Sequence, residues 1–218
     1  MISRRGFIQS GAGLLFSSLF LSCPRPPTQD ENLSPNIFVS KTFDNKGNVT
    51  YTFSGSDSDG SISYIGVQIN GSVKSIDNDK SLTVPVIQGS NTVKANAYDN
   101  EGLASIQSVS SFTPLNDNEA KIRINDLLIP NANTFSNLEK NVLLSLGEKD
   151  NFSIDFLIKK KDNTDAVINY VGFEKNLGTE ISNSRKLSDF SILNLYLFRL
   201  PDNEIISRVN DFIVRGYG

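Results

Sequence analysis

The residues of this chain best suited to chemistry are acidic and lie in two short polar segments. Asp57 and Asp59 stand in a run of serine, aspartate and glycine, and Asp99 and Glu101 flank an asparagine further along the chain. Carboxylate and amide oxygens are the ligands of Ca²⁺, which takes about six to eight of them at roughly 2.3–2.6 Å. If the fold brings the two segments together, they predict a structural calcium site. Two ordinary loops are the alternative, because Asp, Asn and Gly favour turns on backbone grounds alone.

Other chemistry is limited by what the chain lacks. It has no histidine, and its one cysteine is Cys23. Nucleophile pairs that use histidine, histidine-ligated metal sites and an intramolecular disulfide are therefore excluded. No glycine-rich phosphate loop follows a strand pattern and opens a helical one. We expect a protein that is not an enzyme; the alternative is a small carbohydrate-active or accessory protein that uses paired carboxylates.

The first 22 residues have the pattern of an export signal, with a positive start, an apolar middle and a small residue before Cys23. Arg4, Arg5 and Phe7 lie in a segment that resembles the twin-arginine export motif, although Gln9 stands where lysine is common. A general secretory signal that happens to carry two arginines is the alternative, and both routes lead out of the cytoplasm. The apolar run is interrupted and shorter than the ~20 residues that span a bilayer.

Cys23 is expected to carry a lipid. Phe20-Leu21-Ser22-Cys23 resembles the bacterial lipobox, in which cleavage occurs before a diacylated cysteine, although leucine is usual in place of Phe20. The resemblance implies acyl chains on Cys23, and each buried methylene contributes about 0.8 kcal/mol to membrane anchoring. A stray cysteine near a conventional cleavage site is the alternative. The proline-rich, polar segment 23–35 is expected to act as a tether between the anchor and a folded body.

The charge of the chain bears on its partners. Lysine and arginine total 21 against 24 acidic residues, which gives a formal net charge of −3 without a basic patch. Nucleic acid is therefore not an expected partner. We expect a non-catalytic, extracytoplasmic lipoprotein that meets the membrane through its lipid and binds an envelope protein or glycan, or acts as a spacer. A subunit exported with a twin-arginine partner is a further alternative, and the sequence does not name the ligand.

The elements that must position the acidic residues are expected to be short β-strands. Apolar and polar residues alternate in Val49–Phe53, in Val93–Ala97 and in Phe152–Ile158, which places apolar side chains on one face of a sheet. In the first half, strands are expected at residues 37–41, 48–53, 61–70, 72–76, 82–87, 92–98 and 103–112. About seven short strands separated by turn residues predict an antiparallel sandwich.

Two segments of this half resemble bacterial immunoglobulin-like and PKD-like surface domains. Asp57–Gly60 has the D-x-D-G turn of those domains, and Ala97–Gly102 has their A-x-D-x-x-G pattern. The chain lacks the tryptophan and the F-G-D-G turn of PKD domains, so the resemblance covers the broader immunoglobulin-like class over residues 36–113. In that fold the two loops lie at one end of the sandwich. The resemblance thus implies that the predicted calcium ligands, Asp57, Asp59, Asp99 and Glu101, lie near one another.

Internal similarity predicts a second copy of this module. Asn48–Phe53 resembles Asn151–Phe156, and Ile62–Val67 resembles Ile168–Phe173, at nearly the same offset; the Asp-Asn-Glu of residues 99–101 recurs at residues 202–204. We therefore expect an all-β chain of two tandem immunoglobulin-like sandwiches, residues 36–113 and 117–218, after the signal and the tether. The alternative is one β-domain that precedes an unrelated domain.

Overall fold

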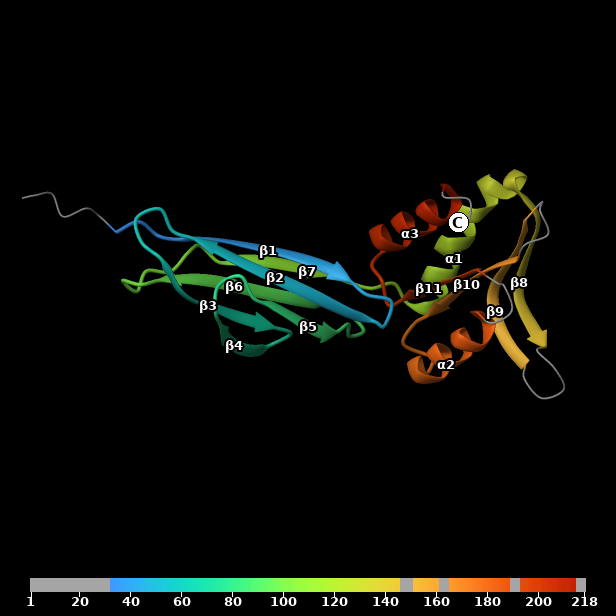
Figure 1. Cartoon of the computed structure of the whole chain (residues 1–218), viewed down its shortest axis with the longest axis horizontal. Helices are drawn as coiled ribbons and strands as arrows, with labels where there is room; N and C mark the ends of the chain where they lie inside the picture. Colours follow the sequence, from blue (N-terminus) through green and yellow to red (C-terminus); the bar gives the residue numbers. More distant parts are fainter. Residues whose placement is uncertain (1–31, 146–150, 161–164, 189–192, 215–218) are drawn as a thin grey trace, which may run out of the picture. The chain divides into compact units, whose positions relative to one another are not determined.

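The computed structural model describes residues 32–145, 151–160, 165–188 and 193–214. Within these residues the chain consists mostly of β-strands in antiparallel sheets, and the expected fold class is confirmed in this respect (Figure 1). The export signal with Arg4, Arg5 and Phe7, the cysteine Cys23, and most of the expected tether lie outside the described residues. Of the helices that the structure describes, none is long and apolar enough to cross a membrane.

The first part of the described chain is a sandwich of two antiparallel sheets, as the sequence predicts. One sheet has the strand order β1-β2-β5 and the other has the order β4-β3-β6-β7. The strands are β1 (Asn36–Phe43), β2 (Asn48–Ser56), β3 (Ile62–Ile69), β4 (Ser72–Ile76), β5 (Ser81–Pro85), β6 (Asn91–Asp99) and β7 (Ser108–Phe112). Each strand overlaps one of the ranges expected from the sequence.

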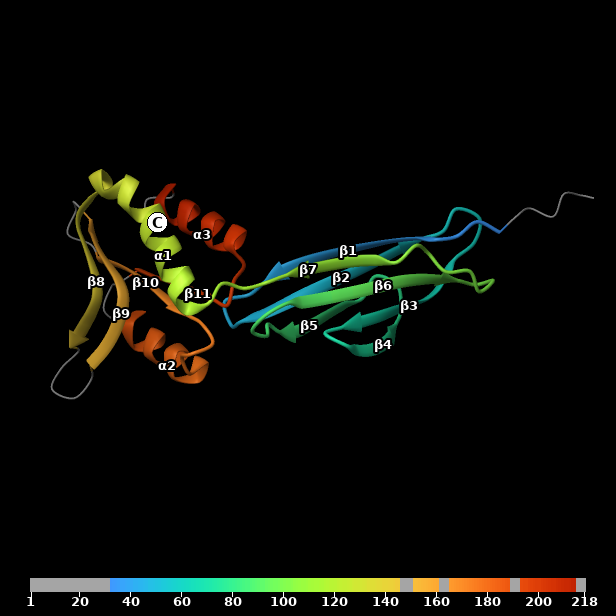
Figure 2. The same cartoon turned by 180° about the vertical axis from the view of Figure 1, so that it is seen from behind.

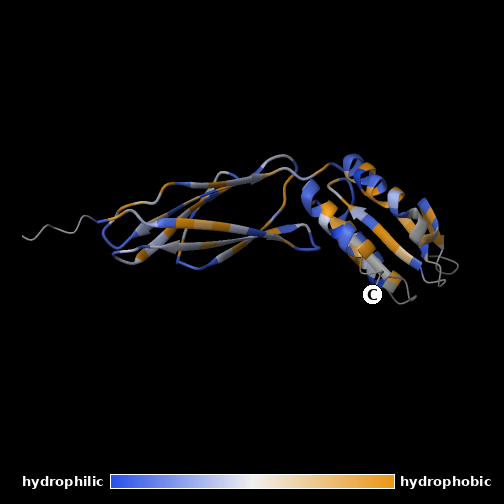
Figure 3. Cartoon of the chain, turned by 90° about the horizontal axis from the view of Figure 1, so that it is seen from above, coloured by the Kyte–Doolittle hydropathy of each residue, from blue (hydrophilic) through white to orange (hydrophobic). Residues whose placement is uncertain are grey.

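The core of the sandwich follows from residue alternation. Successive side chains of a strand point to opposite faces, so an apolar residue at every second position builds one buried face. In β2 these buried positions are Val49, Tyr51 and Phe53, and β6 contributes Val93, Ala95 and Ala97 in the same way. Figure 3 shows this alternation of hydrophobic and hydrophilic residues along the strands.

The second part is a sheet with helices on both faces (Figure 1 and Figure 2). The strand order is β11-β10-β9-β8, in which β10 and β11 are parallel and the other pairs are antiparallel. Its elements are α1 (Asp117–Leu128), a 3₁₀ helix (Ile129–Thr134), β8 (Phe135–Ser145), β9 (Asn151–Lys160), β10 (Asp165–Val171), α2 (Leu177–Ser188), β11 (Leu193–Phe198) and α3 (Asp202–Val214).

Two apolar clusters hold this sheet between its helices. On one face, α1 and α3 contribute Ile124 and Val209 to a cluster that includes Ile168 of the central strand β10. On the other face, the neighbouring β10 residue Val167 packs in a second cluster with Leu187 of α2. Residues 166–171 of β10 are all buried, because helices cover both faces of the strand.

The expected second immunoglobulin-like sandwich at residues 117–218 is wrong, because this region is the helix-covered sheet. The repeated segments Asn151–Phe156 and Ile168–Phe173 do enter strands β9 and β10, but the strand pattern they share with the first half is common to many sheets. The recurring Asp-Asn-Glu begins helix α3 instead of closing a loop. The parallel pairing of β10 with β11 also needs a crossover connection, which α2 supplies.

Candidate functional site

The structure brings the predicted acidic residues to one end of the sandwich, in two segments that we name the acidic loops, residues 57–61 and 99–103. Asp99 ends strand β6 and is 3% exposed. One of its carboxylate oxygens accepts hydrogen bonds from the backbone N–H groups of Glu101 and Leu103, at 2.9 and 2.8 Å. Asp99 therefore stabilises the turn of its own loop, as expected if the segment is an ordinary loop and not a calcium site.

Asn100 joins the two loops. Its backbone N–H donates to the carbonyl of Ser61 at 2.9 Å, and its side-chain oxygen accepts the backbone N–H of Ser61 at the same distance. The point where a Cβ on Gly60 would lie is 2.6 Å from both the Asn100 side-chain oxygen and the Asp57 Oδ2. Gly60 is thus the residue that allows these two oxygens to approach the same point.

Asp57 differs from the other acidic residues of these loops in the surroundings of its carboxylate oxygens. Both of its carboxylate oxygens are buried, and neither has a hydrogen-bond partner among the described residues. Burial, followed by the side chain of Asp59 and then the charge of Asp99, raises the pKa of Asp57 above its ordinary value. A buried carboxylate beside other carboxylates lacks a positive partner, and a bound cation would supply one.

Asp99 differs from Asp57 because donors surround it. Burial raises its pKa, but the N–H of Leu103, the amide of Asn32 and the N–H of Glu101 outweigh that effect and hold the pKa below its ordinary value. The backbone N–H of Glu101 donates to Asp99, and Glu101 itself is exposed. Within the described residues, no group of three or more His, Cys, Asp and Glu side chains is arranged to hold a metal ion.

The end of the expected tether also reaches the acidic loops. The Asn32 side chain donates to Asp99 Oδ2 at 3.1 Å, and the backbone N–H of Leu33 donates to Asp59 Oδ2 at 2.7 Å. The expected boundary after residue 35 is therefore corrected, since Asn32 and Leu33 are hydrogen-bonded to the sandwich. Asp59 and Asp99 bind the chain at the point where it enters the folded module.

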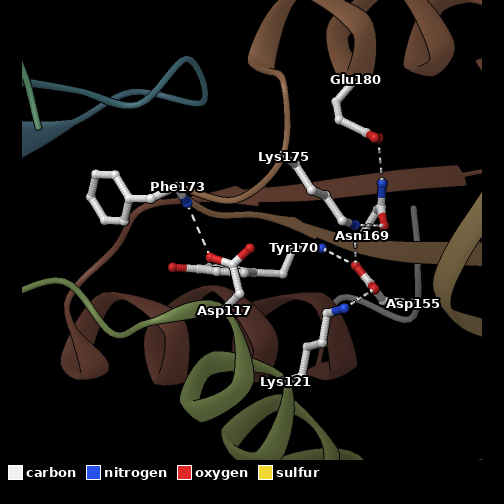
Figure 4. Close-up of polar contacts among 8 residues, drawn as sticks. All are labelled: Asp117, Lys121, Asp155, Asn169, Tyr170, Phe173, Lys175 and Glu180. Atoms are coloured by element: carbon white, nitrogen blue, oxygen red, sulfur yellow. Dashed lines mark hydrogen bonds and ion pairs between the residues drawn. The ribbon is translucent and has the colours of Figure 1, made fainter. Parts of the chain in front are cut away.

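A second polar cluster, which the sequence did not reveal, lies in the helix-covered sheet (Figure 4). Its centre is Asp155 of β9, which is 5% exposed. Asp155 Oδ1 lies 2.8 Å from the Lys121 ammonium of α1, and Oδ2 lies 3.0 Å from the Lys175 ammonium, which precedes α2. The backbone N–H of Tyr170 donates to Oδ2 at 2.8 Å. One buried carboxylate thus links both helical layers to the central strands.

Further contacts extend this cluster. Lys175 also donates to the Asn169 side-chain oxygen at 3.1 Å, and the Asn169 amide donates to Glu180 of α2 at 3.0 Å. Asp117, the first residue of α1, accepts the backbone N–H of Phe173 at 3.0 Å. The sequence gives little signal for this cluster, because Asp155 stands at a polar position of the alternation in β9, between Ile154 and Phe156. Its lysine partners are distant in sequence and carry no spacing motif.

Comparisons with known proteins give low-scoring structural matches. No protein-family model matches the chain, and no curated protein matches it. The fibronectin(III)-like modules of Clostridium thermocellum CbhA match at 21% identity and a TM-score of 0.32, over 36% of this chain and 45% of that chain. The chain therefore spans less than half the length of the CbhA chain.

Two PKD domains match over a similar share of the chain. The PKD1 domain of the Vibrio cholerae metalloprotease PrtV has 20% identity and a TM-score of 0.31, over 37% of this chain and 99% of that domain. The PKD domain of an M14-like peptidase from Thermoplasmatales archaeon SCGC AB-540-F20 has 17% identity and a TM-score of 0.30, over 37% and 91%.

Proposed function

We propose that this protein is a non-catalytic, membrane-anchored extracytoplasmic lipoprotein whose sandwich serves as a spacer or as a binding module for an envelope protein or glycan. The observation that carries the proposal is the lipobox-like Cys23, which follows an export-type signal and precedes a proline-rich segment. That segment leads to Asn32 and Leu33, which are hydrogen-bonded to the sandwich. A lipid on Cys23 would therefore hold the sandwich close to the membrane that carries it.

Cell fractionation of the wild type and of Cys23→Ser tests the anchor. The wild type is expected in the membrane fraction, and detergent should release it. The serine variant cannot be acylated at this position, so it is expected either in the soluble extracytoplasmic fraction or as an unprocessed precursor. Equal membrane retention of a processed Cys23→Ser protein would contradict the proposal. Cys23 is the only cysteine, so the substitution removes no other thiol.

A calcium ion at the acidic loops would serve this role as a joint between the tether and the sandwich. Asp57 supplies two buried oxygens without described partners. The Asn100 side-chain oxygen and Asp57 Oδ2 both lie 2.6 Å from the point where a Cβ on Gly60 would be. Asp59 is close enough to Asp57 to raise its pKa. The remaining ligands would be main-chain oxygens or water, which Ca²⁺ accepts.

Hydrogen exchange at the Leu33 amide tests this joint. Its N–H donates to Asp59, so an ion that orders Asp59 is expected to slow exchange at Leu33. Amides of the helix-covered sheet, such as Tyr170, provide an internal reference that calcium should leave unchanged. Equal exchange at Leu33 with and without millimolar Ca²⁺ would count against the ion, while leaving the lipid anchor as a separate question.

A further inference from the structure

The surroundings of Asp155 contain more positive charge than this buried carboxylate needs. A buried carboxylate is stable when one cation and hydrogen-bond donors compensate it. Asp155 has two ammonium groups, from Lys121 and Lys175, in addition to the Tyr170 N–H. Each ammonium carries three N–H donors, and the pair with Asp155 uses one donor of Lys121. Lys121 is 34% exposed, so its other donors can reach a ligand outside the sheet.

The sheet is irregular on both sides of this carboxylate. Strand β9 pairs with β10 from Lys159 to Phe156. Beyond this paired stretch, the backbone N–H of Tyr170 in β10 donates to the Asp155 side chain. On the other side, Asn141 of β8 lies between two paired residues and has a φ of 52°, in the left-handed region. Asparagine tolerates this conformation better than most residues. Such backbone irregularity is frequent where a sheet forms a functional site.

A pocket opens at this position, between α1 and strands β8 and β9. Its volume is about 380 Å³, which is within the range of small-molecule sites. We name it the Asp155 pocket. Its lining includes two lysines and one carboxylate, Lys121, Lys140 and Asp155, and three amides, Asn118, Asn125 and Asn141. Because Lys175 shares the charge of Asp155 from the other layer, the pocket as a whole is positive.

One lining residue has an unmet hydrogen bond. The side-chain oxygen of Asn125 is buried and has no partner within the described part of the chain. A ligand hydroxyl that reached this oxygen would supply the missing donor. The amides thus select for hydroxyl groups, and Lys121 and Lys140 select for a negative group.

We propose that the Asp155 pocket binds an acidic sugar, a hexose-sized ring that carries a carboxylate or a phosphate. The negative group pairs with Lys121 and Lys140, and the ring hydroxyls bond to Asn125 and the neighbouring amides. Ile122, which is 54% exposed in the same pocket, offers an apolar surface to the C–H face of the ring. The choice of a sugar rests on the envelope-binding role proposed above, whereas the preference for an anion rests on the lysines alone.

Isothermal titration calorimetry of the full-length protein in mild detergent tests the proposal. The probes are glucuronate, glucose 6-phosphate, glucose and inorganic phosphate, at low salt so that surface charges are not screened. At least one acidic sugar is expected to bind at millimolar or lower concentration. Glucose and inorganic phosphate are expected to bind roughly tenfold more weakly, because glucose lacks the negative group and phosphate lacks the ring hydroxyls. No measurable heat with either acidic sugar would overturn the proposal.

Two variants and a control locate the site. Lys140→Gln removes an exposed charge from the pocket and is expected to weaken binding about tenfold. Asn125→Asp adds a negative charge to the lining of the pocket and is expected to weaken binding of an anionic ligand at least as much. Lys159→Gln alters a lysine of the same sheet that pairs with Glu139 and does not line the pocket, so it should leave binding within twofold.

The remaining outcomes also decide the question. Binding of an acidic sugar that is unaffected by Lys140→Gln would place the ligand elsewhere and overturn the assignment. Inorganic phosphate that binds as tightly as glucose 6-phosphate would overturn the sugar. Because these probes are added to purified protein, the pocket can fail while the lipid on Cys23 is present, and the lipid can be absent while the pocket binds.

Discussion

Asp57 and Asp155 are both buried carboxylates, and their different surroundings imply different roles. Asp155 has two lysine partners and a backbone donor, so its charge is compensated inside the protein. Asp57 has carboxylates as neighbours and no described hydrogen-bond partner for either oxygen. We therefore interpret Asp155 as a structural residue of its sheet. For Asp57, we propose that a bound cation would compensate its charge.

The first prediction concerns Asp57→Asn. Because folding raises the pKa of Asp57, the ionised carboxylate destabilises the sandwich. This loss of stability builds up as the pH rises from the ordinary pKa to the raised pKa, is complete above the raised pKa, and is reversed by protonation at lower pH. Without calcium at pH 7, the isosteric asparagine should therefore raise the thermal midpoint. With millimolar Ca²⁺ the wild type should gain stability and the variant should not. Thermal unfolding followed by circular dichroism at both calcium levels measures this.

Asp79→Asn is the matched control for that experiment. Asp79 lies in the same sandwich, is exposed and has a φ of 57°, a conformation that asparagine also adopts. It should change neither the midpoint nor the calcium response by more than a degree or so. A calcium shift that persists in Asp57→Asn would show that the ion does not use this residue.

The second prediction concerns the two lysines of Asp155. Lys121→Met leaves Lys175 to compensate the carboxylate, and the reverse holds for Lys175→Met, so each single change should be modest. The double variant leaves a buried, unpaired charge, and its loss of stability should exceed the sum of the single losses by about 1–3 kcal/mol. Urea unfolding of the four proteins gives this coupling energy. Additive losses would mean that the lysines act independently.

Glu139→Gln is the surface comparison for this cycle. Glu139 pairs with Lys159 at 3.3 Å, and the two side chains are 38% and 45% exposed. Exposed ion pairs contribute about 0–1 kcal/mol. The substitution should therefore cost less than the double lysine variant by a clear margin, and an equal cost would indicate that burial of Asp155 is not what gives its pairs their strength.

Among the elements of the second part of the chain, the start of α1 packs closely against the residue that follows β10. A Cβ on Gly172 would lie 1.4 Å from Asp117 Oδ1, so any other residue here requires the Asp117 side chain to move. Asp117 is 7% exposed and accepts the N–H of Phe173. The first turn of α1 is fixed by the capping box of Asn116 and Glu119, so it cannot easily move aside.

The third prediction is that Gly172→Ala destabilises the protein by about 2 kcal/mol or more, because the methyl group displaces Asp117 and breaks its hydrogen bond to Phe173. Gly178→Ala is the control. Gly178 lies inside α2, its added Cβ would meet the nearest atom at 3.4 Å, and alanine favours a helix by up to about 1 kcal/mol. Urea unfolding should show opposite signs for the two substitutions, and the same sign for both would contradict this account.

The elements also show what the sequence could reveal. The alternation in β2 and β6 predicted the sandwich, because one face of each sheet is solvent-exposed and the pattern has period two. The same reasoning failed for β10, which is buried on both faces and therefore lacks alternation. Residues 174–188 are polar and show no strand alternation, and most of them form α2, whose last turn carries Arg185 and Lys186.

The acidic loops were predictable, and the Asp155 cluster was not. Asp57, Asp59 and Asp99 lie in short turn motifs whose positions in a sandwich follow from the strand order. Lys121, Asp155 and Lys175 come from a helix, a strand and a loop, and only the pairing of β9 with β10 and the packing of α1 bring them together. Local sequence carries no signal for such a meeting of distant residues.

The proposed whole molecule has an export-type signal, a lipid attached to Cys23, and a sandwich. Asn32 and Leu33 form hydrogen bonds to the sandwich at the point where the chain enters it. The sandwich would give the spacing from the membrane, and the helix-covered sheet would carry the Asp155 pocket. Two or more acyl chains are needed for stable anchoring, since a single chain gives only reversible binding.

Mass spectrometry of the protein extracted from membranes tests the proposed anchor most directly. If Cys23 is lipidated, the mature chain should begin at Cys23 and carry the mass of a diacylglycerol-type modification, with residues 1–22 absent. The N-terminal peptide from Cys23 to the first cleavable site should contain all of the added mass. An unmodified Cys23, or a mature chain that begins at another residue and is recovered from the soluble fraction, would contradict it.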